Sequence, residues 1–208
     1  GVSMFCILLA AYPLSRTSKQ FPKRSIFMWI LVFCMLFNGG TVPWYITMKG
    51  YGLVDSIWGL VLGMGLNAYN LILAVNFFKN LPAELEEAAL VDGAEPWKCL
   101  VLIFIPLAKP VIATIALFTI VQYWNEFFRG MVLSARQSNY PLQTYIQQLV
   151  VTYDFSTMNV EQIAQVQKLN KQSLDAAKIV VAMIPVLAVY PFLQKYFVSG
   201  ITLGSIKG

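Results

Sequence analysis

Long apolar segments separated by short polar ones limit the folds that are open to this chain. Apolar residues make up 58% of its 208 residues and charged residues only 12%, about half of the roughly 25% that is usual in soluble domains. A membrane-spanning helix needs about 20 consecutive residues that are mostly apolar, and residues 56–78 form such a segment. The composition therefore predicts an integral membrane protein built from helices.

Four other apolar segments complete the predicted architecture: residues 1–12, 26–37, 97–124 and 176–197. We expect an all-α, polytopic transmembrane bundle of about four complete helices and one partial helix, which forms a single domain over residues 1–208. The first segment is too short to cross a bilayer. We therefore expect a chain that is truncated at its N-terminus and lacks one membrane helix there.

The distribution of basic residues predicts the orientation. Residues 15–25 hold four basic residues and no acidic one, whereas Lys49 is the only basic residue in the loop that leads to Asp55. The positive-inside rule places residues 15–25 in the cytoplasm. Residues 126–175 are then extracytoplasmic and the C-terminus is cytoplasmic. The net charge of +5 forms no basic stripe, so we expect membrane lipid, and no nucleic acid, around this chain.

These 208 positions lack residues that several classes of function require. The sequence has no histidine, which removes Ser–His and Cys–His catalysis and the commonest metal ligand. It has no G-x-x-x-x-G-K-[ST] loop for the phosphates of ATP. Ionisable residues are absent from the middle of the predicted spans, although ion-coupled transporters place such residues there. We expect no catalytic residue, metal site or cofactor in the chain itself.

Residues 81–106 form a short acidic island between two apolar segments. Pro82 suits the first turn of a helix, and the helix dipole favours the acidic residues that follow it, which are Glu84, Glu86 and Glu87. Gly93 is expected to end this helix, and Pro96 suits the start of the next one. The island therefore predicts a helix, a glycine turn and a second helix.

This island resembles the signature of the membrane-spanning permease subunits of ATP-binding-cassette (ABC) importers. That signature is Glu-Ala-Ala, a glycine four residues after the second alanine, and an Ile-x-Leu-Pro ending. The chain has Glu87-Ala88-Ala89, then Gly93, then Ile103-Phe104-Ile105-Pro106, in which Ile105 replaces the leucine. The alternative is an ordinary amphipathic connection between two membrane helices, but the flanking membrane segments supply the context that such a motif requires.

The resemblance implies a set of partners and a role for the island. The chain would work in a bacterial inner membrane with a sister permease, two cytoplasmic ABC ATPases that bind ATP and Mg, and an extracytoplasmic solute-binding protein. It would itself be no enzyme. A cytoplasmic coupling loop, at about residues 79–99, would dock on one ATPase, and the residues implied in coupling are Glu87, Ala88, Ala89, Asp92, Gly93 and Pro106.

Uncharged polar and aromatic residues inside two predicted spans are candidates for the path of the transported solute. The first group is Asn67 and Asn70 on one predicted helix face, with Tyr69 nearby; the second is Thr119, Gln122 and Asn125, beside Tyr123 and Trp124. Amides and aromatic rings can bind the hydroxyl groups and faces of sugars. The alternative is that these side chains only form hydrogen bonds with neighbouring helices.

Four further stretches resemble carbohydrate-uptake permeases of the maltose type, and most of all the branch for complex or acidic oligosaccharides. They are residues 124–127 (WNEF), 140–143 (YPLQ), 189–197 (VYPFLQKYF) and 204–208 (GSIKG). The resemblance implies half of a pore for a sugar or oligosaccharide. It also implies a C-terminal tail between the ATPases, with Gly204, Ser205 and Lys207. An ABC permease for another solute and an ion-coupled sugar transporter remain alternatives.

Overall fold

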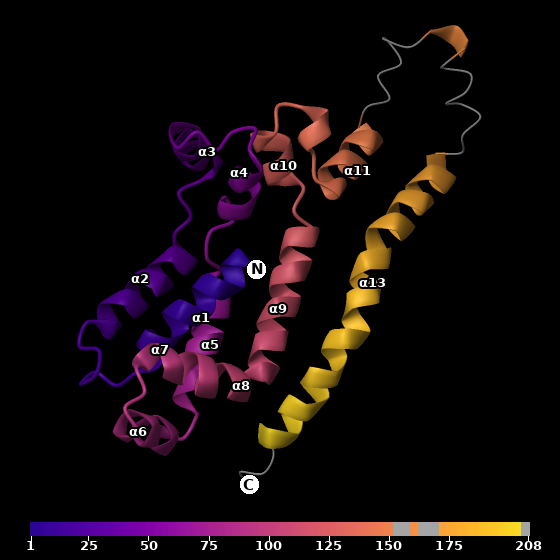
Figure 1. The fold of residues 1–208 in the computed structure, drawn as a ribbon. Coiled ribbons are helices and arrows are strands. Elements are labelled where there is room, and N and C mark those ends of the chain that lie inside the picture. The colour runs from indigo at the N-terminus through magenta and orange to yellow at the C-terminus, as the bar shows by residue number, and fades with distance from the viewer. Residues whose placement is uncertain (152–158, 162–170, 205–208) are drawn as a thin grey trace. The chain divides into compact units, whose positions relative to one another are not determined.

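The structure is a computed structural model that describes residues 1–151, 159–161 and 171–204. All regular structure in these residues is helical (Figure 1), which confirms the predicted fold class. Contacts between residues divide the chain into two compact units. Unit 1 comprises residues 1–43, 64–120 and 192–208, and unit 2 comprises residues 44–63 and 121–191. The single permease domain stays a prediction.

Unit 1 is built around the contact between its first helix, α1 (Val2–Ser15), and α5 (Ala68–Lys79), which lie side by side (Figure 1). Ala11 and Ala74 are fully buried in this core, and such small residues let two helix backbones approach closely. The other elements of the unit are α2 (Arg24–Leu36), α6 (Ala83–Val91), α7 (Pro96–Cys99), the π-helical turn η1 (Leu100–Phe104), α8 (Ile105–Leu107) and most of α9 (Lys109–Trp124).

Unit 2 has its own packing, in which α4 (Ile57–Leu62) lies against α10 (Phe128–Leu133) and α10 lies against α11 (Leu142–Val151). Ser56 caps α4, because its side chain accepts a hydrogen bond from the backbone N–H of Trp58. The unit also contains most of α3 (Thr41–Gly50), the short 3-10 helix η2 (Gln137–Asn139) and the first part of α13 (Lys171–Gly204).

The prediction of one uninterrupted span over residues 56–78 is wrong. The segment forms two helices, since α4 ends at Leu62 and α5 begins at Ala68. Gly65 between them has φ = +62°, a left-handed conformation that glycine adopts without a steric penalty. Asn67 then caps α5. Hydropathy recognises an apolar run, but it does not recognise a helix stop followed by a cap within that run.

The apolar segment of residues 97–124 bends near Pro106 and Pro110. The helical axis turns by 83° between Pro96–Leu107 and Lys109–Trp124. Proline lacks an N–H group and its ring collides with the preceding helical turn, and the π-helical turn Leu100–Phe104 lies directly before Pro106. The apolar segment of residues 26–37 is followed by a break, because α2 ends at Leu36 and α3 begins at Thr41.

The last helix, α13, is longer than the predicted span over residues 176–197. It runs from Lys171 to Gly204 and contains Pro185 and Pro191. Residues 200–208 are short and glycine-rich, but the described part of this tail, residues 200–204, is helical. Its first residues continue a helix that is already formed, so they bear no cost of nucleation.

A bilayer crossing requires a helix that is both long and apolar, and no single helix of the described residues meets both requirements. Two bent pairs meet them when their halves are taken together: Arg24–Leu36 with Thr41–Gly50, and Pro96–Leu107 with Lys109–Trp124.

Candidate functional site

The turn between α6 and α7 has a defined geometry in which Gly93 has φ = +78°. The N–H of Gly93 donates to the carbonyl of Leu90 at 3.1 Å, and the N–H of Ala94 donates to the carbonyl of Ala89 at 2.9 Å. These two bonds define a Schellman motif, the helix ending that favours glycine at this position. Pro96 then occupies the first turn of α7. The predicted helix, glycine turn and second helix are confirmed.

Most of α6 is accessible at the surface of the chain. Glu87, Ala88 and Asp92 are exposed, as are Gly93 and Pro106, so five of the six predicted coupling residues could contact a partner. Ala89 differs, because it packs partly buried against the core of unit 1. Pro82 occupies the cap position before α6 rather than its first turn. This is a correction of one residue, within the usual uncertainty of helix boundaries.

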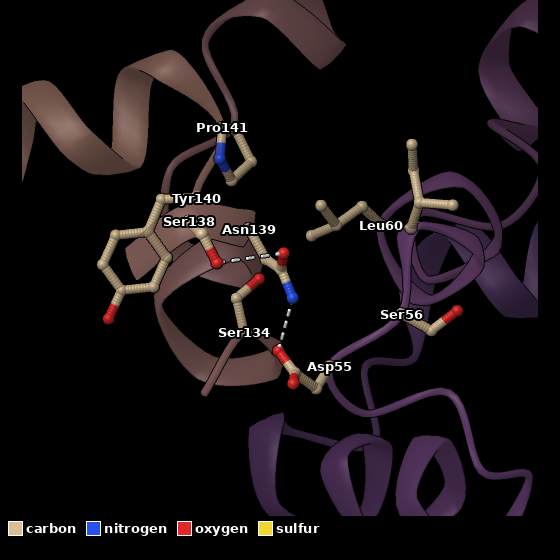
Figure 2. A pocket seen from close by; sticks show the side chains of 9 residues that line it. Asp55, Ser56, Leu60, Ser134, Ser138, Asn139, Tyr140 and Pro141 are labelled. Atoms are coloured by element: carbon tan, nitrogen blue, oxygen red, sulfur yellow. Dashed lines mark hydrogen bonds between the residues drawn. The ribbon is translucent and has the colours of Figure 1, made fainter. Parts of the chain in front are cut away.

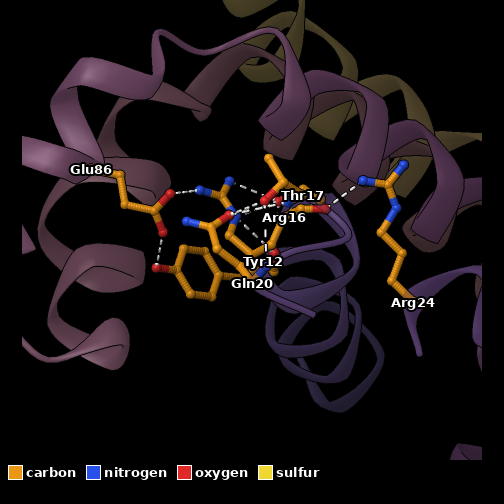
Figure 3. Close-up of polar contacts among 7 residues, drawn as sticks. Tyr12, Arg16, Thr17, Gln20, Arg24 and Glu86 are labelled. Carbon is orange, nitrogen blue, oxygen red and sulfur yellow. Dashed lines mark hydrogen bonds and ion pairs between the residues drawn. The ribbon is translucent and has the colours of Figure 1, made fainter. Parts of the chain in front are cut away.

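Glu86 is the one buried residue among the nine of α6, with 5% of its surface exposed. Both of its carboxylate oxygens bind side chains at the end of α1 (Figure 3). The hydroxyl of Tyr12 donates to Oε1 at 2.6 Å. Nη1 of Arg16 forms an ion pair with Oε2. The acid therefore attaches α6 to α1 through two polar contacts in a largely desolvated position.

The guanidinium of Arg16 is held on several sides. Its Nε donates to the carbonyl of Tyr12 at 3.3 Å, and its Nη2 donates to Oγ of Ser15 at 2.9 Å. Its Cζ lies 4.4 Å from the ring centroid of Phe104 and 4.8 Å from that of Tyr12, within the range of cation–π attraction. The carbonyl of Arg16 accepts a hydrogen bond from Arg24 at the start of α2.

Sequence reasoning missed this cluster. Residues 15–25 contain no acidic residue, and the partner of Arg16 is Glu86, which lies 70 positions later in the chain. A local signal existed. Glu86 and Ala89 are three residues apart, which places them on one helix face, and Ala89 also packs inward. The signal names no partner, so only the fold could identify Arg16.

The predicted solute-path residues in unit 1 make contacts within the unit. We predicted that Asn67 and Asn70 share a helix face, and this is wrong. Asn67 caps α5, and its Oδ1 accepts a hydrogen bond from the N–H of Asn70 at 3.1 Å. Nδ2 of Asn70 donates to Oγ1 of Thr119 at 3.4 Å, and both residues are buried. This contact joins α5 to α9, as the alternative interpretation expected. Tyr69 is exposed.

The corresponding residues in unit 2 are partly engaged with backbone carbonyls. The hydroxyl of Tyr123 donates to the carbonyl of Val61 at 2.9 Å. Nε1 of Trp124 donates to the carbonyl of Ala182 in α13 at 2.8 Å. Gln122 and Asn125 are exposed. The assignment of any of these residues to a solute path stays a prediction.

A cavity of about 540 Å³ with both polar and apolar side chains in its lining lies in unit 2, between the start of α4 and the segment that follows α10 (Figure 2). Asp55 borders it, with φ = +57°. Its Oδ1 accepts from Nδ2 of Asn139 at 2.9 Å and from the N–H of Ala135 at 3.2 Å. The hydrogen bond from Asn139 is the main reason that the pKa of the Asp55 carboxyl is lowered. These contacts hold the two loops of the cavity together.

A comparison with known protein families shows which family this chain belongs to. The family described as "Binding-protein-dependent transport system inner membrane component" matches residues 6–203. This chain belongs to that family. The permease is therefore a transport component of the bacterial inner membrane, and the island of residues 81–106 lies within the matched region.

Two relatives of the permease come from Bacillus subtilis (strain 168). Protein LplC is 40% identical over 208 residues, which cover all of this chain and 70% of the relative. "Polygalacturonan/rhamnogalacturonan transport system permease protein YtcP" is 41% identical over 208 residues, which cover all of this chain and 72% of the relative.

A solved structure is also similar to the permease. It is the crystal structure of a bacterial ABC transporter involved in the import of the acidic polysaccharide alginate, with a TM-score of 0.84 and 37% sequence identity. The match covers 94% of this chain and 69% of the solved one. The permease has the fold of ABC importer subunits, as the resemblance implied.

Proposed function

We propose that this permease forms half of the translocation pore for a complex or acidic oligosaccharide, and that α6 couples this pore to a cytoplasmic ATPase. The observation that supports the coupling role is that two adjacent acids of α6 have different environments. Glu86 is buried and attaches α6 to the rest of unit 1, whereas Glu87 is exposed beside it. A helix that is fixed on one side and presents charge on the other is suited to dock a partner.

The proposed cargo rests on the named relatives. One is a permease for polygalacturonan or rhamnogalacturonan, and the similar solved structure imports alginate. These polysaccharides carry many hydroxyl groups, and amides and aromatic rings can bind such groups. Of the predicted path residues, Tyr69, Gln122 and Asn125 are the exposed ones, so they are our first candidates for contact with the sugar.

The proposal includes the partners that the resemblance implies. A sister permease would complete the pore, two ABC ATPases would bind ATP and Mg, and an extracytoplasmic solute-binding protein would deliver the sugar. The permease would hold no cofactor of its own. Its C-terminus would be cytoplasmic and would reach between the ATPases. In that tail, Gly204 ends α13, whereas Ser205 and Lys207 lie outside the described residues.

The test of the coupling role is a charge series at Glu87. A charge-assisted hydrogen bond from Glu87 to a basic residue of the ATPase would contribute about 1.5–3 kcal/mol. We expect Glu87→Gln to weaken docking, and Glu87→Arg to weaken it more, because reversal adds repulsion to the loss of attraction. The measurements are co-purification of the ATPase and uptake of labelled oligogalacturonides or alginate oligosaccharides into reconstituted vesicles.

Glu161 provides the control for this series. It is also an exposed acid, and it lies in the predicted extracytoplasmic segment, where no ATPase can bind. Glu161→Arg should therefore leave docking unchanged although it changes the charge by the same amount. Wild-type docking and uptake in Glu87→Arg would show that α6 is only a connection between two helices.

A further inference from the structure

Apolar packing does little to hold α6 in place. Its apolar residues Leu85, Leu90 and Val91 are 40%, 43% and 87% exposed, so none of them is buried, and Ala89 packs partly against the core. The stability of a helix in a protein comes mainly from burial of an apolar face. A helix of nine residues with one half-buried alanine lacks such a face. Polar contacts therefore contribute to its position.

The chain itself connects α6 to only two elements. Short segments join it to α5 before it and to α7 after it. The contacts of Glu86 add a third connection, because Tyr12 and Arg16 belong to the end of α1 and lie 74 and 70 positions earlier in the sequence. Figure 3 shows both side chains directed at the carboxylate of Glu86.

The connection to α1 fixes the orientation of the Glu86 carboxylate in addition to pairing its charge. Tyr12 and Arg16 bind different oxygens of the carboxylate, so the acid is fixed in orientation as well as in place. The side chains of Arg16 and Glu86 are 12% and 7% exposed, which reduces screening by water and ions. The rings of Phe104 and Tyr12 also lie within cation–π distance of the guanidinium. A preorganised contact of this kind can transmit a displacement between two helices.

From this geometry we infer that Arg16 and Glu86 act as positioning residues that join α6 to α1, so that a displacement of α6 by the ATPase reaches α1 directly. The inference rests on the proposed coupling role of α6. It adds a route that bypasses the chain through α5 and α7. Because the carbonyl of Arg16 also binds Arg24, the same route extends to the first turn of α2.

The test uses the complete importer, with its ATPases and solute-binding protein, in reconstituted vesicles. We expect Glu86→Gln and Arg16→Gln to retain the ATPase, because the exposed surface of α6 is unchanged. Uptake of labelled oligogalacturonides or alginate oligosaccharides per ATP hydrolysed should fall by about fivefold or more, the usual lower range for coupling between sites. The double variant should be no worse than either single variant, since the two residues act as one contact.

Two further variants separate this role from a general effect on folding or charge. Lys19→Gln removes the same charge as Arg16→Gln from the same segment, but Lys19 is exposed and its variant should keep the wild-type ratio of uptake to hydrolysis. The charge-exchanged variant Arg16→Glu with Glu86→Arg should recover part of the ratio. If either single variant fails to assemble, the exchanged variant must restore assembly and uptake together.

The outcomes are distinguishable from failure of the proposed function. If Glu87→Arg is impaired while Glu86→Gln keeps a wild-type ratio, the coupling role holds and the connection through α1 is wrong. Additive losses in the double variant would overturn the inference too, and so would an exchanged variant that recovers nothing. If Glu87→Arg behaves as wild type, the coupling role of α6 itself fails.

Discussion

Two adjacent glutamates in α6 have opposite environments, because Glu86 is buried and Glu87 is exposed. Successive residues of a helix point about 100° apart, so Glu86 can face unit 1 while Glu87 faces away from it. Burial of a carboxylate is costly unless it is paired, and Tyr12 and Arg16 supply the pairing for Glu86. A family signature that begins at Glu87 therefore omits the acid that fixes the helix.

Gly93 is the second decisive residue in this site. Its φ of +78° is unfavourable for other residues, but no heavy atom lies within 4 Å of the position that a Cβ would occupy. A substitution should therefore cost backbone strain alone, about 1–2 kcal/mol for alanine and less for asparagine, which tolerates this conformation. We expect ATPase docking and thermal stability to decrease in the order Gly93→Asn, Gly93→Ala, Gly93→Val.

The control for the Gly93 series is Gly50→Ala. Gly50 also has open space around it, but its φ is not positive, and it ends α3. This variant should show no loss of stability in a thermal unfolding measurement on the purified importer. Equal losses in Gly50→Ala and Gly93→Ala would contradict the argument from backbone strain.

At the scale of elements, the break between α4 and α5 is stabilised by polar groups. The last carbonyls of a helix have no partner within it, and Tyr123 and Trp44 supply donors for two of them. The hydroxyl of Tyr123 binds the carbonyl of Val61 at 2.9 Å, and Nε1 of Trp44 binds that of Gly63 at 3.0 Å. The end of α4 is therefore a formed structure and not a frayed segment.

The start of α5 after this break depends on Asn67. Asn67→Ala should lower stability by about 1 kcal/mol, the usual cost of losing a helix cap. Asn67→Asp should keep the cap, because a carboxylate also accepts from the N–H of residue 70. Thermal unfolding of both variants measures the difference. Asn125→Ala, at an exposed position, is the matched control, and a loss in Asn67→Ala no larger than in that control would argue against a capping role.

At the scale of the whole molecule, the orientation predicted from the basic segment can be measured directly. Ser18 and Ser138 are both exposed in the structure. Because the positive-inside rule places residues 15–25 in the cytoplasm, a cysteine introduced by Ser18→Cys should react with an impermeant reagent only from that side. A cysteine introduced by Ser138→Cys should react only from outside.

The labelling requires a background in which the three free cysteines, Cys6, Cys34 and Cys99, have been replaced. The protein that keeps both Ser18 and Ser138 in that background is the control for non-specific reaction with the reagent. Reaction of both positions from one side would overturn the orientation. It would also remove the cytoplasmic location on which the coupling role of α6 depends.

Features that depend on a few neighbouring residues were predictable from the sequence alone. The helix that Gly93 ends, the bend at Pro106 and Pro110, and the break after residue 37 all follow from the φ preferences of glycine or the missing N–H of proline. The apolar segments likewise predicted the helical class. Local chemistry determines these features whatever the rest of the chain does.

The tertiary structure decided which polar groups meet. Arg16 and Glu86 are 70 positions apart, and Asn70 and Thr119 are 49 positions apart; neither pair has a sequence spacing that marks it. The burial of Glu86 rather than Glu87 depends on where the end of α1 lies, and Asn67 became a cap because Gly65 interrupts the preceding apolar run. Contacts between distant segments select among side chains that are equivalent in local sequence, because only the packed chain determines which of them lose water and which find a partner.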